Sequence, residues 1–144
     1  MESSIVTWLY DIGLTPILLL QLFISLFVAI LFTQSGLDKI INWSGEKEFY
    51  HAHFSKSILR DSISLIMPVL TAFELLAGFL SGLGLIFLLI TGKNHIAALG
   101  MILAALSTCM LFFGQRVAKD YEGSAVLVPY FLVTMAGLYL YLML

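Results

Sequence analysis

The sequence predicts an all-α membrane protein, a bundle of four transmembrane helices with a short amphipathic interfacial helix between the first two. Three observations lead to this class. Of the 144 residues, 60% are hydrophobic and only 11% are charged, whereas about 25% of the residues in a typical soluble domain are charged. The mean hydropathy is +1.02. Four segments also reach the roughly 20 apolar residues that a helix needs to cross a bilayer.

These four transmembrane segments are expected at residues 14–42, 64–90, 95–118 and 125–144. Together they occupy most of the chain, so no stretch is left for a separate soluble domain. We therefore expect residues 1–144 to form a single transmembrane domain.

The first transmembrane helix and the segment after it carry different patterns. Pro16 suits the first turn of a helix, because that position needs no backbone N–H. Residues 42–62 then interleave aromatic and charged side chains. Tyr50 and Phe54 are four residues apart and share one helix face. This pattern is typical of a short amphipathic helix that lies on the membrane surface.

Small residues mark the second transmembrane helix. Gly78 and Gly82 form a GxxxG motif, and Ser81 and Gly84 add to the small-residue content. Such residues allow the backbone of a neighbouring helix to approach closely. We therefore expect Gly78 and Gly82 to lie at a contact between helices.

Lysine and arginine are unevenly distributed between the two ends of the predicted bundle. One end holds only Lys93. Cytoplasmic loops of membrane proteins carry an excess of these residues, so the loops after the first and third helices are expected in the cytoplasm and both termini outside. The residues that set this orientation are Lys39, Lys47, Lys56, Arg60, Arg116 and Lys119.

Glu74 lies within the apolar stretch TAFELLAGFLSG of the second helix. An ionised carboxylate at the centre of a membrane helix costs about 2.5–3.5 kcal/mol on insertion scales. We expect Glu74 to face the bundle interior, where it pairs with Arg116 or Lys39 or is held neutral by burial. The hypothetical ligand-binding residues are Gln34, Lys39, Glu74 and Arg116, and the structural polar network around them is Ser35, Asp38, Gln115, Lys119 and Asp120.

Two interpretations of this polar cluster stay open. It is either a structural polar contact that fixes helix register or a small polar pocket for a quinone head group or a small anion.

The single cysteine, Cys109, excludes an intramolecular disulfide and a CxxC relay. His51 and His53 lack a clear third ligand, so we expect no metal site. We also expect no covalently bound cofactor and no nucleic-acid partner.

Three stretches resemble the DoxX family of small four-helix membrane proteins. They are LFTQSGLDKIINW at the end of the first helix, FELLAGFLSGLGL in the second, and GQRVAKDYEGS after the third. The resemblance covers nearly the whole chain, and Ser35, Gly36, Lys39 and Glu74 are its most recognisable residues. It implies a location in the bacterial inner membrane and an association with respiratory or redox chemistry.

The resulting functional expectation is an accessory subunit of a quinone-linked membrane complex, which is not an enzyme on its own. Its partners would be the lipid bilayer and other membrane subunits. One alternative is a structural or assembly subunit of a larger membrane machine, held by the GxxxG motif and the amphipathic segment. A small transporter that works as a homo-oligomer is the third hypothesis.

Overall fold

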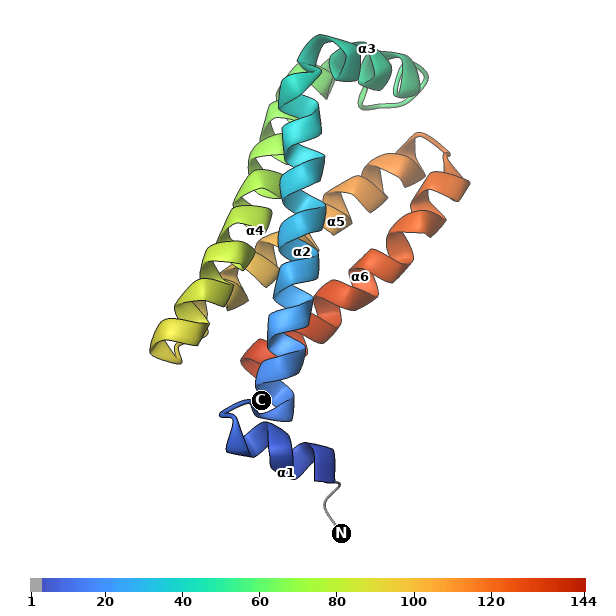
Figure 1. Ribbon diagram of the computed structural model, residues 1–144. Coiled ribbons are helices and arrows are strands. Elements are labelled where there is room, and N and C mark those ends of the chain that lie inside the picture. Colours follow the sequence, from blue (N-terminus) through green and yellow to red (C-terminus); the bar gives the residue numbers. More distant parts are fainter. Residues whose placement is uncertain (1–3) are drawn as a thin grey trace.

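The computed structural model describes residues 4–144, and this part of the chain forms six α-helices and one short 3₁₀ helix with no strand (Figure 1). A short helix precedes the first long one and was not predicted. The helices are α1 (Ser4–Asp11), α2 (Pro16–Ile41), α3 (Trp43–His53), η1 (Arg60–Ser62), α4 (Ile63–Thr91), α5 (His95–Val117) and α6 (Tyr121–Leu142).

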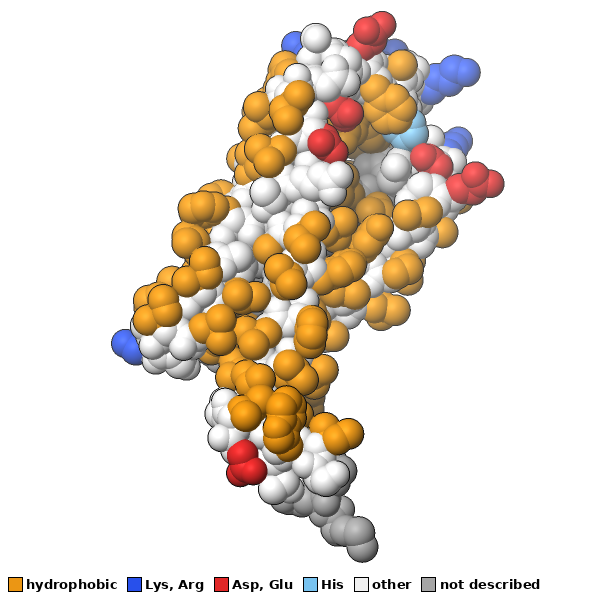
Figure 2. Space-filling view, viewed as in Figure 1, with side chains coloured by type: hydrophobic (Ala, Val, Ile, Leu, Met, Phe, Trp, Pro, Cys, Tyr) orange, Lys and Arg blue, Asp and Glu red, His pale blue; other side chains and the backbone are white. Residues whose placement is uncertain are grey.

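Four of these helices, α2, α4, α5 and α6, are long and apolar enough to cross a membrane. The shortest of the four, α6, has 22 residues, which corresponds to about 33 Å at 1.5 Å per residue. Figure 2 shows exposed apolar side chains over the middle of the molecule and most charged side chains toward its ends. The all-helical class and the four apolar helices are therefore confirmed, and they are consistent with an integral membrane protein.

The start of α6 differs from the sequence prediction. The helix begins at Tyr121, four residues before the predicted start at 125. The Asp120 side chain accepts a hydrogen bond of 2.9 Å from the Gly123 backbone N–H, and this cap allows the helix to begin earlier. Pro129 consequently lies inside α6.

Glycines determine how closely the long helices approach one another. A Cβ atom at Gly78 would collide with the backbone of Thr33 on α2, and one at Gly84 would collide with the backbone of Ala97 on α5. A Cβ atom at Gly82 would meet only the Ala29 side chain, at an ordinary 3.6 Å. Of the two glycines in the predicted GxxxG motif, Gly78 is therefore the one that the close helix contact requires.

The four long helices diverge toward the end that α3 covers. Figure 1 shows α5 and α6 leaning away from α2 at this end, whereas α2 and α4 stay side by side. The central core is built from small or slender side chains, and Val28, Ala77, Ala97, Met101 and Ala104 are all fully buried. The wider end beneath α3 is where the buried polar residues and the cavities described next are found.

Candidate functional site

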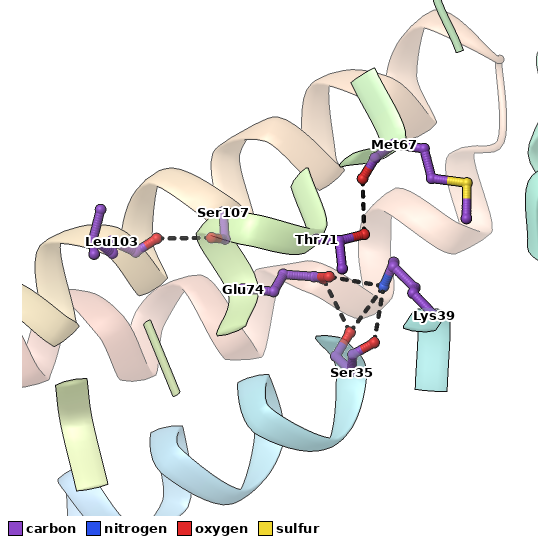
Figure 3. Close-up of polar contacts among 7 residues, drawn as sticks. All are labelled: Ser35, Lys39, Met67, Thr71, Glu74, Leu103 and Ser107. Atoms are coloured by element: carbon purple, nitrogen blue, oxygen red, sulfur yellow. Dashed lines mark hydrogen bonds and ion pairs between the residues drawn. The ribbon is translucent and has the colours of Figure 1, made fainter. Parts of the chain in front are cut away.

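A buried ion pair joins α2 and α4 at the wider end of the bundle (Figure 3). The Lys39 ammonium lies 2.9 Å from Oε2 of Glu74. Glu74 is completely buried and Lys39 is only 6% exposed. The carboxylate therefore faces the interior, and its cation is Lys39.

Ser35 completes this ion pair. Its hydroxyl donates to Oε1 of Glu74 at 3.0 Å. The Lys39 ammonium donates to the Ser35 hydroxyl at 3.1 Å and to the Ser35 carbonyl at 3.3 Å. The Lys39 ammonium thus has hydrogen-bond acceptors on Ser35 and an ion-pair partner in Glu74, whose Oε2 atom makes no hydrogen bond within residues 4–144. A ligand would compete with Ser35 and Glu74 for this ammonium.

The neighbouring hydroxyls of Thr71 and Ser107 do not join this cluster. Each donates at 2.8 Å to a carbonyl one turn earlier on its own helix, Thr71 to Met67 and Ser107 to Leu103 (Figure 3). Such bonds satisfy a hydroxyl locally in an apolar environment. The polar contacts of Glu74 are therefore limited to α2.

A small cavity adjoins the Lys39–Glu74–Ser35 cluster, with a volume of about 120 Å³. It is large enough for a few water molecules, since each occupies about 30 Å³ in the liquid. Ser35 and Glu74 provide polar wall on one side, and Thr108 and Tyr130 provide it on the other. The Tyr130 hydroxyl has no hydrogen-bond partner within the described part of the chain.

A larger cavity, which we call the α3 cavity, has a volume of about 290 Å³. Figure 2 shows a recess between the α3 end of the molecule and the α5–α6 hairpin. Its wall comes from α3, the first half of α4 and the end of α5, and it is mostly apolar. The side chains that line it include Tyr50, His53, Phe54, Met67, Leu111 and Gln115. Leu111 also contributes to the wall of the smaller cavity.

A polar contact links α3 to the α5–α6 hairpin at the rim of the α3 cavity. Nε2 of His53 lies 2.7 Å from the side-chain oxygen Oε1 of Gln115, so the ring donates the hydrogen bond. The same nitrogen lies 3.6 Å from Oδ2 of Asp120. Because Asp120 also caps α6, this contact holds the far end of α3 over the cavity.

Tyr50 places a free hydrogen-bond donor at the α3 cavity. Its side chain is half-buried, and its hydroxyl has no hydrogen-bond partner among residues 4–144. Burial raises the pKa of Tyr50, and the negative charges of Glu74 and Glu46 raise this pKa further. The phenol therefore stays protonated at neutral pH and can donate to a ligand.

The predicted site residues separate into three groups. Lys39, Glu74 and Ser35 come together. Gln115 and Asp120 contact His53 instead, at the rim of the α3 cavity. The remaining residues, Gln34, Asp38, Arg116 and Lys119, are exposed.

Two members of the exposed group, Gln34 and Arg116, were expected to bind the same ligand as Glu74. Gln34 and Asp38 lie in a shallow depression on the outer face of α2. The Arg116 guanidinium lies 4.5 Å from the centre of the Tyr121 ring. Within residues 4–144, Lys39 is the only lysine or arginine that forms an ion pair with Glu74. The expected convergence of Gln34 and Arg116 on Glu74 is therefore not what the structure has.

A second buried polar network, at the opposite end of the bundle, was missed from the sequence. The Tyr141 hydroxyl lies 2.7 Å from the Ser25 hydroxyl and donates to the Gln21 carbonyl at 3.1 Å. The Gln21 side chain donates to the Leu140 carbonyl at 3.0 Å, and the Asn94 side chain donates to the Tyr141 carbonyl at 3.2 Å. The four-residue spacing of Gln21 and Ser25 in an apolar helix was the signal that could have revealed it.

No group of three or more His, Cys, Asp or Glu side chains in the described chain could hold a metal ion. Comparisons with protein families, with curated proteins and with solved structures found no match. The resemblance to the DoxX family thus stays a prediction that depends on the sequence motifs. The features of the structure that bear on function are the two cavities.

Proposed function

We propose that this chain is an integral membrane protein that binds a neutral amphipathic molecule of the quinone class in the α3 cavity, as an accessory subunit of a quinone-linked redox complex. The observation that carries this proposal is an apolar cavity at one end of four membrane-capable helices, lined in part by Tyr50, whose hydroxyl has no hydrogen-bond partner among residues 4–144. The DoxX resemblance supplies the redox context.

The size and composition of the α3 cavity suit a small ring with an apolar tail. Its volume of about 290 Å³ is close to the lower end of the range of about 300–1,000 Å³ for ligand pockets. Such pockets are mostly apolar with a few polar groups that fix orientation. A quinone carbonyl accepts hydrogen bonds, and Tyr50 and the Gln115 amide can donate them.

The charges around the α3 cavity favour a neutral ligand over an anion. Lys39 is occupied by Glu74 and Ser35. Glu46 and Glu74 both act on Tyr50, so an anion beside this hydroxyl would meet negative potential. The small-anion hypothesis is therefore less well supported than the quinone hypothesis.

We propose the bacterial inner membrane as the location, with α3 and the α5–α6 turn on the cytoplasmic side. The lysine and arginine excess at this end supports the orientation. In this arrangement α3 lies at the headgroup level, where Phe49 and Trp43 suit the interface. A ligand tail would leave the α3 cavity toward the lipid.

A structural or assembly subunit is the second candidate function. The observation that favours it is the buried Lys39–Glu74–Ser35 cluster, which joins α2 to α4. A pore through one chain is the least supported of the three, because fully buried Val28, Ala77 and Ala104 fill the bundle between its two polar ends.

Binding of a short-chain ubiquinone analogue to the purified protein in nanodiscs tests the proposed function. Quenching of Trp43 fluorescence, in a Trp8→Phe background, would report binding at the α3 end. Tyr50→Phe should weaken binding up to about tenfold, the equivalent of one hydrogen bond of about 0.5–1.5 kcal/mol. Tyr139→Phe, on the exposed face of α6, is the matched control.

Two results would overturn the quinone assignment. One is no saturable quenching by the wild type, and the other is equal affinity of the Tyr50→Phe and Tyr139→Phe variants. Purification in mild detergent tests the subunit role separately. Redox enzymes in the eluate would support it, whereas secretion or motility components would support the assembly alternative.

A further inference from the structure

A row of exposed side chains runs along one face of α2, and its member Phe27 also contacts the Tyr130 ring of α6, with 6.5 Å between the ring centroids. The intervals along this row alternate between four and three residues. Every member except Gln34 is apolar, and the row comprises Phe23, Phe27, Ile30, Gln34, Leu37 and Ile41.

Gln34 lies at a depth where lipid would surround it. The 26 residues of α2 span about 39 Å, which exceeds a hydrocarbon core of about 30 Å by about 9 Å. If this excess is divided between the two ends, Gln34 lies about 6 Å inside the core. Its amide has no hydrogen-bond partner among the described residues, and a bare amide in hydrocarbon is strongly unfavourable.

The exposed face of α4 offers a comparison within the same protein. It has the same alternating spacing of four and three residues, through Leu65, Val69, Ala72, Leu76, Phe79 and Leu83. No amide or charged side chain interrupts this part of the row. The spacing alone is therefore shared by both helices, and Gln34 distinguishes α2.

We propose that the α2 row is the interface of a homodimer, in which α2 of one copy packs against α2 of a second copy. A glutamine amide carries both donors and an acceptor, so two copies of Gln34 can satisfy each other across a twofold axis. Alternating three- and four-residue spacing is also the pattern of left-handed helix pairs, and side-chain amides bond across such pairs in membranes.

Asp38 is compatible with a second copy because of its depth. It is one turn closer than Gln34 to the end of α2, about 6 Å along the axis, and is exposed. At the headgroup level water and salt screen the repulsion between two carboxylates. A different partner with a basic side chain would instead pair with Asp38, and the experiment below separates these cases.

Cysteine crosslinking of the purified protein in lipid vesicles tests the dimer, because this chain is then the only protein present. In a Cys109→Ser background, Ile30→Cys and Leu37→Cys should each crosslink to the same position in a second copy. Ile86→Cys is the matched control, because Ile86 is 53% exposed on α4 and Ile30 is 59% exposed on α2.

Gln34→Leu should raise the dissociation constant of the dimer about three- to tenfold, as measured by energy transfer between labelled copies. The melting temperature of the monomer should not fall, because Gln34 makes no hydrogen bond or ion pair within residues 4–144, and Gln34→Asn should largely retain association. Equal crosslinking at positions 37 and 86, or an unchanged dissociation constant for Gln34→Leu, would overturn the proposal. A monomer at all protein-to-lipid ratios would also overturn it.

Discussion

The two ends of the helix bundle satisfy their buried polar groups differently. At the α3 end, a charged cluster of Lys39, Glu74 and Ser35 lies beside two cavities. At the α1 end, Tyr141 and Ser25 belong to a neutral network of hydrogen bonds. Figure 1 shows α5 and α6 leaning away from α2 at the α3 end, whereas at the opposite end α4 lies apart from α2.

This difference indicates that the two ends of the bundle have different roles. Neutral hydrogen bonds in a packed interior fix the helices at little electrostatic cost. A buried charged pair is expensive to desolvate and is weak evidence for stability in itself. Its position beside open volume is therefore better explained if the α3 end has a task beyond holding the fold.

Removal of the Glu74 carboxylate should have the largest effect on stability. Glu74→Leu leaves the buried Lys39 ammonium without its counter-charge, which typically costs about 3–5 kcal/mol. The unfolding free energy in detergent, from denaturant titration, measures this loss. Asp38→Leu is the control, because Asp38 is exposed and forms no ion pair within residues 4–144.

The double variant Lys39→Met with Glu74→Leu sharpens this test. Replacement of an entire buried pair by apolar side chains is often neutral or stabilising, so the double variant should recover most of the loss. If the double variant is as unstable as Glu74→Leu alone, the loss comes from packing rather than from the unpaired charge.

Glycine substitutions should have the next largest effect on stability, and they test the close packing at the α1 end. A Cβ atom at Gly84 would collide with the Ala97 backbone, which cannot move away as a side chain can. Gly84→Ala should therefore cost about 1–3 kcal/mol. Gly82→Ala, whose Cβ would lie 3.6 Å from Ala29, should cost less than about 0.5 kcal/mol. Equal melting temperatures for the two variants would contradict the structure at this contact.

Tyrosine-to-phenylalanine changes should have smaller effects and should differ between the two ends. Tyr141→Phe removes a hydroxyl that contacts Ser25 and Gln21, so it should cost about 1 kcal/mol of unfolding free energy. Tyr50→Phe removes a hydroxyl with no partner in the described chain, so it should leave stability nearly unchanged. A loss for Tyr50→Phe as large as for Tyr141→Phe would mean that Tyr50 is structural.

The sequence predicted the long helices well because the bilayer imposes a strong rule on length and apolarity. It also singled out Glu74 and named Lys39 and Arg116 as its candidate cations without choosing between them, since a carboxylate in an apolar helix needs a partner. The choice between Lys39 and Arg116 depended on helix rotation. Lys39 follows Ser35 by four residues, so both face Glu74 from the same side of α2.

The α3 cavity could not be predicted from the sequence, because it depends on how far α5 leans away from α4. Tyr50 was recognised only as part of a surface helix, and His53 as part of that helix and as a metal-ligand candidate without a third ligand. The contact that His53 makes joins residues far apart in the chain. The contact of His53 with Gln115 spans 62 positions. Local spacing carries no information about such a contact, whereas it could have revealed the Gln21 and Ser25 pair.

A small effect is expected for Arg116, and it distinguishes the structure from the sequence expectation. A pairing with Glu74 would make Arg116→Ala cost about 3–5 kcal/mol. The structure instead places the exposed guanidinium over the Tyr121 ring, where a cation–π contact contributes about 0.5–1 kcal/mol. Arg116→Ala should therefore lower the melting temperature only slightly more than Arg60→Ala, whose residue forms a 3.4 Å exposed pair with Asp61. A loss for Arg116→Ala close to that for Glu74→Leu would mean that Arg116 supports the buried carboxylate in the membrane.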